Sequence, residues 1–278
     1  MNYTQLNISV QDDEQADIFT ALLADYPFDS FMQEEDHLSA YIINEEYALC
    51  RDSVTQLLAE YDASWQVAEV EQQNWNQEWE SGFEPVSVAG RRPILIRAAH
   101  HDPAPEGVVD VIIAPRMSFG TGHHATTALM SQTIAQMDFA GMRGLDMGCG
   151  TGVLAIVALK CGAREMVAVD IDDWACDSCR DSGALSGVEI DVRCGSMDVV
   201  GGEKFDFVLA NINRNILLDM MPSFAEAVDA GGWLLMSGFL REDVEHIERG
   251  AAECGFAVES VAENDGWMVV VCKKSSQW

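Results

Sequence analysis

The glycine-rich segment Gly148–Gly152 constrains the fold of this chain more than any other feature of its sequence. It follows the apolar run Arg143–Met147, a predicted strand, and precedes Val153–Lys160, a predicted helix. Glycines at such a turn allow the backbone to approach a ligand, and the amide groups that open the helix point toward it. In open α/β sheets the ligand lies at the carboxyl ends of the strands. The segment therefore predicts a doubly wound α/β domain with a ligand site at this turn.

Strands and helices continue to alternate beyond residue 140, which is typical of a parallel sheet covered on both faces. Further parallel strands are predicted at residues 166–170, 188–194, 205–210 and 233–237. The last two strands, 256–262 and 267–272, are joined by only four residues. Because a parallel crossover needs about a dozen residues or more, this pair predicts a terminal antiparallel hairpin.

Residues 1–80 predict a second, smaller domain. Apolar and polar residues alternate from Leu6 to Val10, as in a half-buried strand, and Asp12 offers an N-cap for the helix that follows. Strands predicted at 37–43 and 65–70 flank a second helix. Two strand-helix-strand units in this order are typical of a small ferredoxin-like α+β domain.

The stretch from Gln72 to Arg92 has a different composition. Trp75, Trp79 and Phe83 are spaced along a polar, acidic segment that ends in Gly90–Pro93, and we interpret it as a connector with aromatic anchors. We therefore expect three parts: an acidic recognition domain at 1–80, a linker at 81–92 and the α/β domain at 93–278.

The chain is strongly acidic, with 46 Asp and Glu against 16 Lys and Arg and a formal net charge of −30. Such a chain repels the phosphate backbone, so we expect no direct binding to nucleic acid. A basic protein partner is more plausible, although solubility alone explains acidity equally well. Residues 1–82 hold 18 acidic residues and one basic residue, Arg51, which gives this segment a net charge of −17. This uneven distribution favours an interaction module.

The lengths of the apolar runs and the spacing of the cysteines indicate where in the cell the protein is expected. No run approaches the ~18 residues needed to cross a bilayer, and no secretory signal is visible at the amino terminus. The eight cysteines follow no framework spacing, so we expect reduced thiols in a cytoplasmic protein that does not contact a membrane. Cys176 and Cys179 have a C-x-x-C spacing, but they lie in a predicted helix without a second ligand pair, and we predict no metal site.

Two acidic residues flank the glycine-rich turn in the predicted domain. Asp170 ends the second strand, 22 residues past Gly148, where a carboxylate can accept hydrogen bonds from a ribose diol. Asp146 precedes the turn and suits a cationic ligand, such as the amino group of a methionyl moiety, better than a pyrophosphate. Val153 stands where a dinucleotide fingerprint has its last glycine, and no lysine follows as in a phosphate-binding loop.

These residues resemble a known superfamily. The segment Asp146–Gly152 resembles motif I of class I S-adenosylmethionine-dependent methyltransferases, and Ala168–Asp172 is similar to their ribose-binding strand. More narrowly, Phe119–Thr127 resembles the Phe-Gly-Thr-Gly-Thr-His-Pro-Thr-Thr segment of the ribosomal protein eleven methyltransferases. His123 and Ala125 depart from that pattern, where the family has Thr and Pro. Further similar segments are Asn74–Trp79, Ala210–Ile212 and Leu235–Leu240.

The resemblance implies a fold, an activity and a set of site residues. It implies a Rossmann-like domain that binds S-adenosylmethionine and transfers its methyl group to lysine side chains and the amino-terminal amine of a basic large-subunit ribosomal protein. Carried over to this sequence, the family's cofactor contacts fall on Thr127, Gly148, Asp170 and Asn211. The turn adds Asp146 and Gly150 as candidate cofactor-binding residues.

Asn211 is the candidate catalytic residue. A lysine amine has a pKa of about 10.4, and only its neutral form attacks an electrophilic methyl, so transfer depends on placing the lone pair in line with that methyl. The Asn211 carbonyl can accept the amine's hydrogens and aim that lone pair. An alternative role is a cap for the helix that starts near Asn215.

Three other functions stay open. One is an S-adenosylmethionine-dependent methyltransferase of another protein or a small molecule, which would not need an acidic recruiting domain. Another is a non-catalytic nucleoside-binding scaffold, which Asp170 and Asn211 disfavour. A nicotinamide-dependent dehydrogenase is favoured least.

Overall fold

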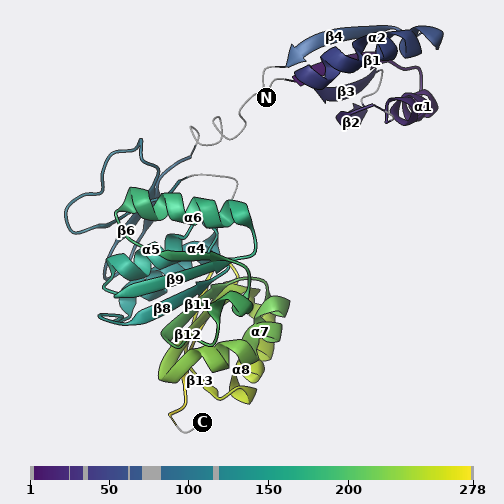
Figure 1. Ribbon diagram of the computed structural model, residues 1–278. Helices are drawn as coiled ribbons and strands as arrows, with labels where there is room; N and C mark the ends of the chain where they lie inside the picture. Colours follow the sequence, from purple (N-terminus) through teal and green to yellow (C-terminus); the bar gives the residue numbers. More distant parts are fainter. Residues whose placement is uncertain are drawn as a thin grey trace. The chain divides into compact units, whose positions relative to one another are not determined.

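The computed structural model describes residues 3–24, 26–33, 37–61, 63–70, 83–114 and 119–276 (Figure 1). The chain divides into two compact units, Met1–Trp75 and Asn76–Trp278. The connector tryptophans Trp75 and Trp79 lie outside the described residues. Among the helices that are described, none has the length and apolarity to cross a membrane.

The first unit is a four-stranded antiparallel sheet with two helices. In chain order its elements are β1 (Tyr3–Ser9), α1 (Asp13–Leu23), β2 (Phe28–Gln33), β3 (His37–Ile43), α2 (Asn44–Glu60) and β4 (Trp65–Val70). The sheet order is β2-β3-β1-β4, so each helix connects two strands that are not neighbours.

Local chemistry explains the start of α1 and the packing of this unit. The Asp12 side chain accepts a hydrogen bond from the Gln15 amide at 2.9 Å, which confirms the predicted N-cap. Alternate residues of β1, among them Leu6 and Ile8, pack with Phe19 of α1 and Leu58 of α2. One face of the sheet therefore forms the core of this unit together with both helices.

The second unit is built on a seven-stranded sheet in the order β10-β9-β8-β11-β12-β14-β13. The strands β8 to β12 are parallel to one another, whereas β14 is antiparallel to both β12 and β13. The strand bounds are β8 (Arg143–Met147), β9 (Glu165–Asp170), β10 (Asp191–Cys194), β11 (Phe205–Asn211), β12 (Val228–Leu240), β13 (Phe256–Asn264) and β14 (Trp267–Lys274). The predicted α/β class with a mostly parallel sheet is confirmed.

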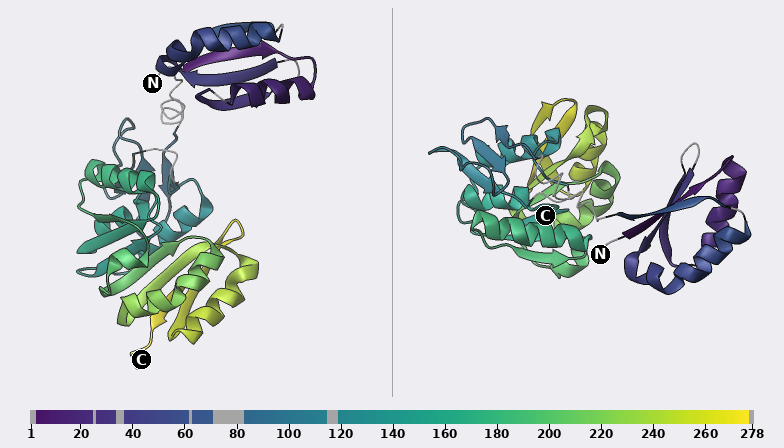
Figure 2. Two further views of the ribbon diagram at one scale, coloured as in Figure 1. Left: turned by 45° about the vertical axis from the view of Figure 1, so that its right-hand side comes forward. Right: turned by 90° about the horizontal axis from the view of Figure 1, so that it is seen from above.

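Helices cover both faces of this sheet (Figures 1 and 2). On one face lie α4 (Ala125–Gln136), α5 (Val153–Lys160) and α6 (Asp173–Ser186). Apolar side chains of α4 and α5 share a core with one side of the strands, and Cys179 of α6 packs with Ala168 of β9. On the other face lie α7 (Arg214–Ala227) and α8 (Val244–Glu253). The short 3-10 helices η1 (Met197–Val200) and η2 (Arg241–Asp243) complete the connections.

A small three-stranded sheet packs outside α5 and α6. It consists of β5 (Val86–Val88), β6 (Ile94–Arg97) and β7 (Val109–Ile112). The hydroxyls of Ser182 and Ser186 on α6 accept hydrogen bonds from main-chain amides at and just after β7, at 2.8–2.9 Å. Strand β5 lies inside the range 81–92 that the sequence analysis expected to be a linker, so residues 86–88 are part of the folded second unit.

Candidate functional site

The glycine-rich turn joins β8 to α5 in a conformation that only glycine adopts easily. Gly148, Gly150 and Gly152 have φ angles of 73°, 52° and 77°. A Cβ on Gly150 would lie 2.2 Å from the main-chain oxygen of Phe119, and a Cβ on Gly148 would lie 2.3 Å from a methyl carbon of Ile212. The turn is therefore packed so closely that side chains at these positions do not fit.

Two segments that are distant in the sequence meet at this turn. The Thr151 amide donates a hydrogen bond to the Phe119 carbonyl at 2.9 Å, and the Thr151 hydroxyl donates to the Gly120 carbonyl at 2.7 Å. Thr151 is completely buried. The segment that begins at Phe119 and the glycine-rich turn, which the sequence analysis identified as separate motifs, thus form one wall.

Asp170 is fixed at the end of β9 by main-chain donors. Its Oδ2 accepts a hydrogen bond from the Gly150 amide at 2.9 Å, and its Oδ1 accepts one from the Asp172 amide at 3.1 Å. These two bonds orient the carboxylate toward the turn, and each oxygen keeps lone pairs for a further donor. Such an oriented carboxylate can bind a pair of hydroxyl groups.

These elements surround a pocket of about 460 Å³ at the carboxyl ends of the parallel strands. Four of the predicted site residues line it: Gly148, Gly150, Asp170 and Asn211. Its other lining residues come from the Phe119 segment, the loops after β9, β10 and β11, α7, β12 and the start of β14; they are Phe119, His124, Thr126, Met147, Ile171, Asp172, Ala175, Gly195, Ser196, Ile212, Asn213, Ile216, Met220, Gly238 and Trp267.

Asn211 presents an unpaired oxygen to this pocket. It is the last residue of β11, it is 9% exposed, and its Oδ1 is buried without a hydrogen-bond partner. Since buried polar atoms in proteins are nearly always paired, this oxygen marks a place for a donor from a ligand. The N-cap position of α7 belongs to Asn213, so the alternative role of Asn211 as that helix's cap is not what the structure shows.

Asp146 and Thr127 do not line the pocket. Asp146 is 1% exposed, and its Oδ2 accepts a hydrogen bond from the Ala155 amide of α5 at 3.2 Å. Burial raises the pKa of the Asp146 carboxyl to about 7, although the bond from Ala155 opposes the shift. Thr127 is fully buried on α4 with an unpaired hydroxyl, next to Thr126, which does line the pocket.

Trp267 is a pocket residue that the sequence analysis treated only as part of a strand. It begins β14, and its ring lies edge-on to the His124 ring with centroids 4.7 Å apart. An antiparallel strand begins at the edge where its parallel neighbours end, and this places Trp267 at the site. His124 in turn accepts a hydrogen bond from the Thr126 amide at the start of α4.

The cysteine pair in the C-x-x-C spacing lies in α6, as predicted. Over the residues that the structure describes, no group of three or more His, Cys, Asp or Glu side chains is arranged to hold a metal ion.

Comparison with known proteins identifies the family. The family model of the ribosomal protein L11 methyltransferase (PrmA) matches residues 3–275. The chain belongs to this family. The ribosomal protein L11 methyltransferase of Porphyromonas gingivalis is 39% identical over 260 residues, which cover 90% of this chain and 88% of that protein. That of Chlorobaculum parvum is 30% identical over 277 residues, which cover 96% of this chain and 95% of that protein.

A solved structure agrees with this assignment. The ribosomal protein L11 methylase of Lactobacillus delbrueckii subsp. bulgaricus superposes with a TM-score of 0.62 at 26% sequence identity, over 68% of this chain and 97% of that one. Membership in the family establishes the chain as a methyltransferase, as the sequence analysis predicted from the motifs at Asp146–Gly152 and Phe119–Thr127.

Proposed function

We propose that this protein transfers methyl groups from S-adenosylmethionine to amines of ribosomal protein L11, namely lysine side chains and the amino-terminal amine. The observation that carries the proposal is the buried, unpaired Oδ1 of Asn211 in the pocket beside the glycine-rich turn. The names of the relatives support L11 as the substrate. The eight cysteines are all free thiols, which supports a reducing, cytoplasmic location.

Asp170 and the turn at Gly148–Gly152 are suited to hold this cofactor. The Asp170 carboxylate would accept hydrogen bonds from the ribose hydroxyls, and the backbone of Gly148 and Gly150, which lines the pocket, would lie against the cofactor. The cofactor supplies an electrophilic methyl group on a sulfonium. We retain Thr127 and Asp146 as candidate contacts with the cofactor. Both are buried, and neither lines the pocket itself.

Asn211 acts on the acceptor amine in this proposal. The amine must lose a proton before it attacks, and its lone pair must then point along the axis of the departing bond. A neutral amide oxygen can accept the N–H groups of the amine without competing for the lone pair. Asn211 therefore positions the amine rather than acting as a base.

We further propose that the first unit is a ferredoxin-like domain that recruits the substrate. The sheet order β2-β3-β1-β4 with two crossing helices supports this class, and the net charge of −17 over residues 1–82 supports attraction to a basic ribosomal protein. In the second unit, the paired β13 and β14 support the terminal hairpin of class I methyltransferases. We propose that the linker expected at residues 81–92 ends before β5 (Val86–Val88), which belongs to the second unit.

The decisive experiment is single-turnover methyl transfer with Asn211→Ala, at saturating enzyme, cofactor and L11. We expect a rate about a hundredfold below wild type, because a group that positions the amine in the transition state affects the chemical step. The matched control is Asn215→Ala, an exposed asparagine in α7 that hydrogen-bonds Arg214, and it should react at the wild-type rate. A wild-type rate for Asn211→Ala would exclude the positioning role.

The same assay separates the alternatives. Transfer to L11 in which every amine has been blocked by acetylation should stop, because an amide nitrogen has no free lone pair to attack the methyl group. If methyl transfer occurs with small amines but not with L11, the protein is a methyltransferase of another substrate.

A further inference from the structure

Cys176 lies at the junction of two strand ends beside the cofactor pocket. It is fully buried on α6, and its thiol contacts the Asp170 carbonyl at 3.5 Å and the Arg193 carbonyl at 3.7 Å. Asp170 ends β9, and Arg193 is the penultimate residue of β10. The sulfur of Cys176 therefore bridges the carboxyl ends of these two strands.

Cys194 supplies a second thiol at the same place. It is the exposed last residue of the edge strand β10, directly opposite Asp170 in the parallel register. Cys194 and Cys176 are thus both neighbours of Asp170, the first through strand pairing and the second through its sulfur. One thiol of the pair is thus open to solvent, and the other is buried against the main chain of the cofactor site.

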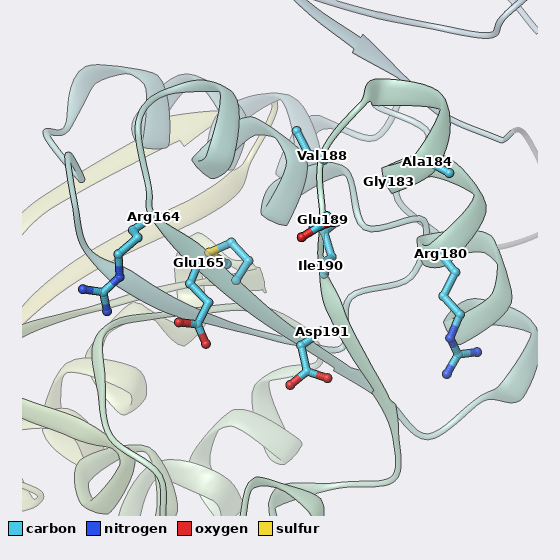
Figure 3. A pocket seen from close by; sticks show the side chains of 10 residues that line it. Arg164, Glu165, Arg180, Gly183, Ala184, Val188, Glu189, Ile190 and Asp191 are labelled. Atoms are coloured by element: carbon cyan, nitrogen blue, oxygen red, sulfur yellow. The ribbon is translucent and has the colours of Figure 1, made fainter.

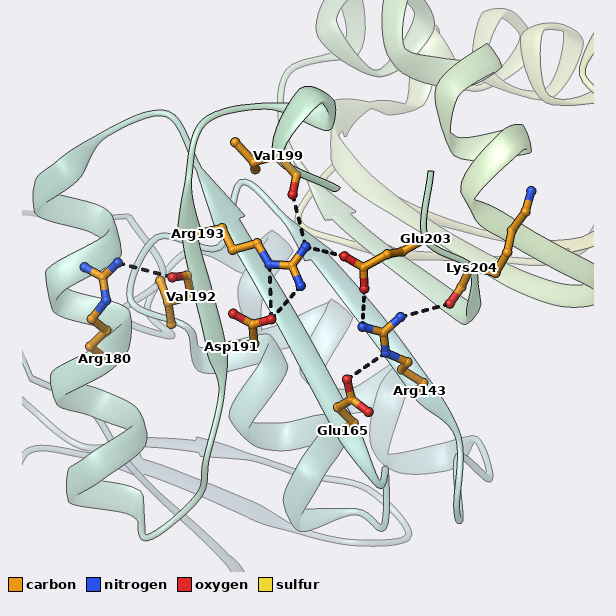
Figure 4. Close-up of polar contacts among 9 residues, drawn as sticks. All are labelled: Arg143, Glu165, Arg180, Asp191, Val192, Arg193, Val199, Glu203 and Lys204. Carbon is orange, nitrogen blue, oxygen red and sulfur yellow. Dashed lines mark hydrogen bonds and ion pairs between the residues drawn. The ribbon is translucent and has the colours of Figure 1, made fainter. Parts of the chain in front are cut away.

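Arg180 places a positive charge beside the two thiols. It lies one turn after Cys176 on α6, and its guanidinium is 3.8 Å from the Cys194 sulfur. A hydrogen bond to Asp177 at 2.9 Å holds it there. A second bond, to the Val192 carbonyl at 3.2 Å, is drawn in Figure 4. Arg180 also lines a surface cavity of about 640 Å³ (Figure 3). The thiolate is the form of cysteine that reacts with peroxides, and the Arg180 guanidinium lies beside the exposed sulfur where it forms.

We propose that Cys194 and Cys176 are a peroxide-sensitive dithiol whose oxidation to a disulfide weakens cofactor binding. The Cys194 thiolate attacks hydrogen peroxide, forms a sulfenic acid and releases hydroxide, which takes up a proton to become water. The Cys176 thiol then attacks the sulfenic sulfur. An S–S bond forms, the sulfenic S–O bond breaks, and the thiol proton leaves with the oxygen as a second molecule of water. Peroxide is the two-electron oxidant.

The order in which the two thiols react follows from their surroundings. Burial raises the pKa of Cys176 to about 12, and the neighbouring Cys194 thiol adds to this shift, so Cys176 stays protonated at neutral pH. Cys194 is exposed and faces the guanidinium, so it meets the oxidant first. A second close pair, Cys149 and Cys179, is buried on both sides and is shielded from oxidants in the folded protein.

The coupling to the pocket runs through the main chain of Asp170. Its carbonyl accepts hydrogen bonds from the Gly195 amide at 2.8 Å and from the Cys176 thiol. A disulfide removes the thiol proton, so the hydrogen bond from Cys176 to the Asp170 carbonyl is lost. It also draws Cys194 toward α6, and Cys194 directly precedes Gly195 and Ser196, which line the pocket. This part of the proposal rests on the proposed cofactor site at Asp170.

The test is peroxide treatment of the full-length protein, followed by two separate measurements. Peptide mapping after alkylation should find a disulfide between Cys176 and Cys194, while Cys149 and Cys179 stay alkylated. Calorimetry should show S-adenosylmethionine affinity falling about three- to tenfold, the loss of roughly one hydrogen bond, and recovering after dithiothreitol.

Matched variants separate the dithiol from general oxidation. Cys194→Ser should form no disulfide and keep its cofactor affinity in peroxide. Cys254→Ser, at a half-buried thiol after α8, should respond like wild type. Arg180→Gln should oxidise more slowly. No disulfide between Cys176 and Cys194 in the wild type, or a disulfide with unchanged affinity, would overturn the proposal. If the reduced protein fails to bind the cofactor, the proposed function is wrong. The peptide map then tests by itself whether Cys176 and Cys194 form a disulfide.

Discussion

Gly150 and the Phe119 carbonyl are packed so closely that a Cβ on Gly150 would lie 2.2 Å from that oxygen. The contact joins the first residue of the Phe119 segment to the middle of the glycine-rich turn, where Thr151 donates hydrogen bonds to the same Phe119 oxygen and to the Gly120 carbonyl. Backbone rather than side chain fills the space, so the shape of this wall of the pocket depends on the absence of a single carbon atom.

Gly150→Ala should therefore damage the site more than its φ angle alone implies. Gly141 is the matched control, because it has a φ of 75° and open space around its α-carbon. Gly141→Ala should cost about 1 kcal/mol of unfolding free energy, the price of a left-handed alanine. Gly150→Ala should cost roughly 1–3 kcal/mol more through overpacking. Urea unfolding measures both, and only Gly150→Ala should reduce cofactor affinity.

Removal of the Asp170 carboxylate should weaken cofactor binding. Hydrogen bonds to a charged acceptor contribute about 1.5–3 kcal/mol, so Asp170→Ala should lower affinity for S-adenosylmethionine about ten- to a hundredfold. Calorimetry at neutral pH is the measurement, with Asp219→Ala, an exposed carboxylate on α7, as the control. An unchanged dissociation constant for Asp170→Ala would remove Asp170 from the cofactor site.

Glu203 should make stability depend on pH in the acid range. Its carboxylate pairs with Arg193 and Arg143 at 2.5 Å each, which ties β10 and β8 together (Figure 4). These two guanidinium groups, Arg193 first, lower the pKa of Glu203 to about 2. A lowered pKa stabilises the fold above the ordinary pKa of about 4.3 and loses that effect as pH falls toward 2.

Glu203→Gln tests this dependence. With 34% of the side chain exposed, solvent screening limits the expected loss to roughly 1 kcal/mol at pH 7. The difference from wild type should shrink between about pH 4.3 and pH 2, as the wild-type carboxylate becomes protonated. Urea unfolding across this range measures it, with Glu189→Gln, an exposed acid before β10, as the control. A difference that persists at low pH would point to packing rather than charge.

Association with L11 should slow as salt increases. Raising ionic strength from about 0.01 M to about 1 M shortens the Debye length from about 30 Å to about 3 Å, and long-range steering is lost. Stopped-flow rates should fall by about tenfold or more. Neutralising Asp52 and Glu60, exposed on α2, should slow association more than neutralising Glu245 and Glu253, exposed on α8. A salt-independent rate would leave solubility as the reason for the acidity.

Local signals in the sequence predicted local structure well. Asp12 caps α1 as expected, and the predicted strands at 37–43 and 65–70 match β3 and β4. Strand β2 was missed because a bulge between Phe28 and Ser30 disturbs the alternation of apolar residues on which the prediction depends.

Side-chain direction and tertiary pairing were harder to predict. Asp146 and Met147 are neighbours in β8 and point to opposite faces of the sheet, so Met147 lines the pocket while Asp146 bonds to α5. The sequence places Asp146 beside the turn but does not reveal which face it takes. Trp267 reaches the pocket through the pairing of β14 with β12, which no local pattern encodes.

The outer strand β13 has a consequence for how copies of this protein meet. It ends the seven-stranded sheet, and all its residues after Phe256 are exposed. Free N–H and C=O groups on such an edge invite another chain to extend the sheet. The exposed Glu259 lies on this strand, and the register shifts between Val258 and Ser260. Two copies aligned edge to edge would bring like charges together on an irregular strand, so self-aggregation through this edge is discouraged even in a crowded cell.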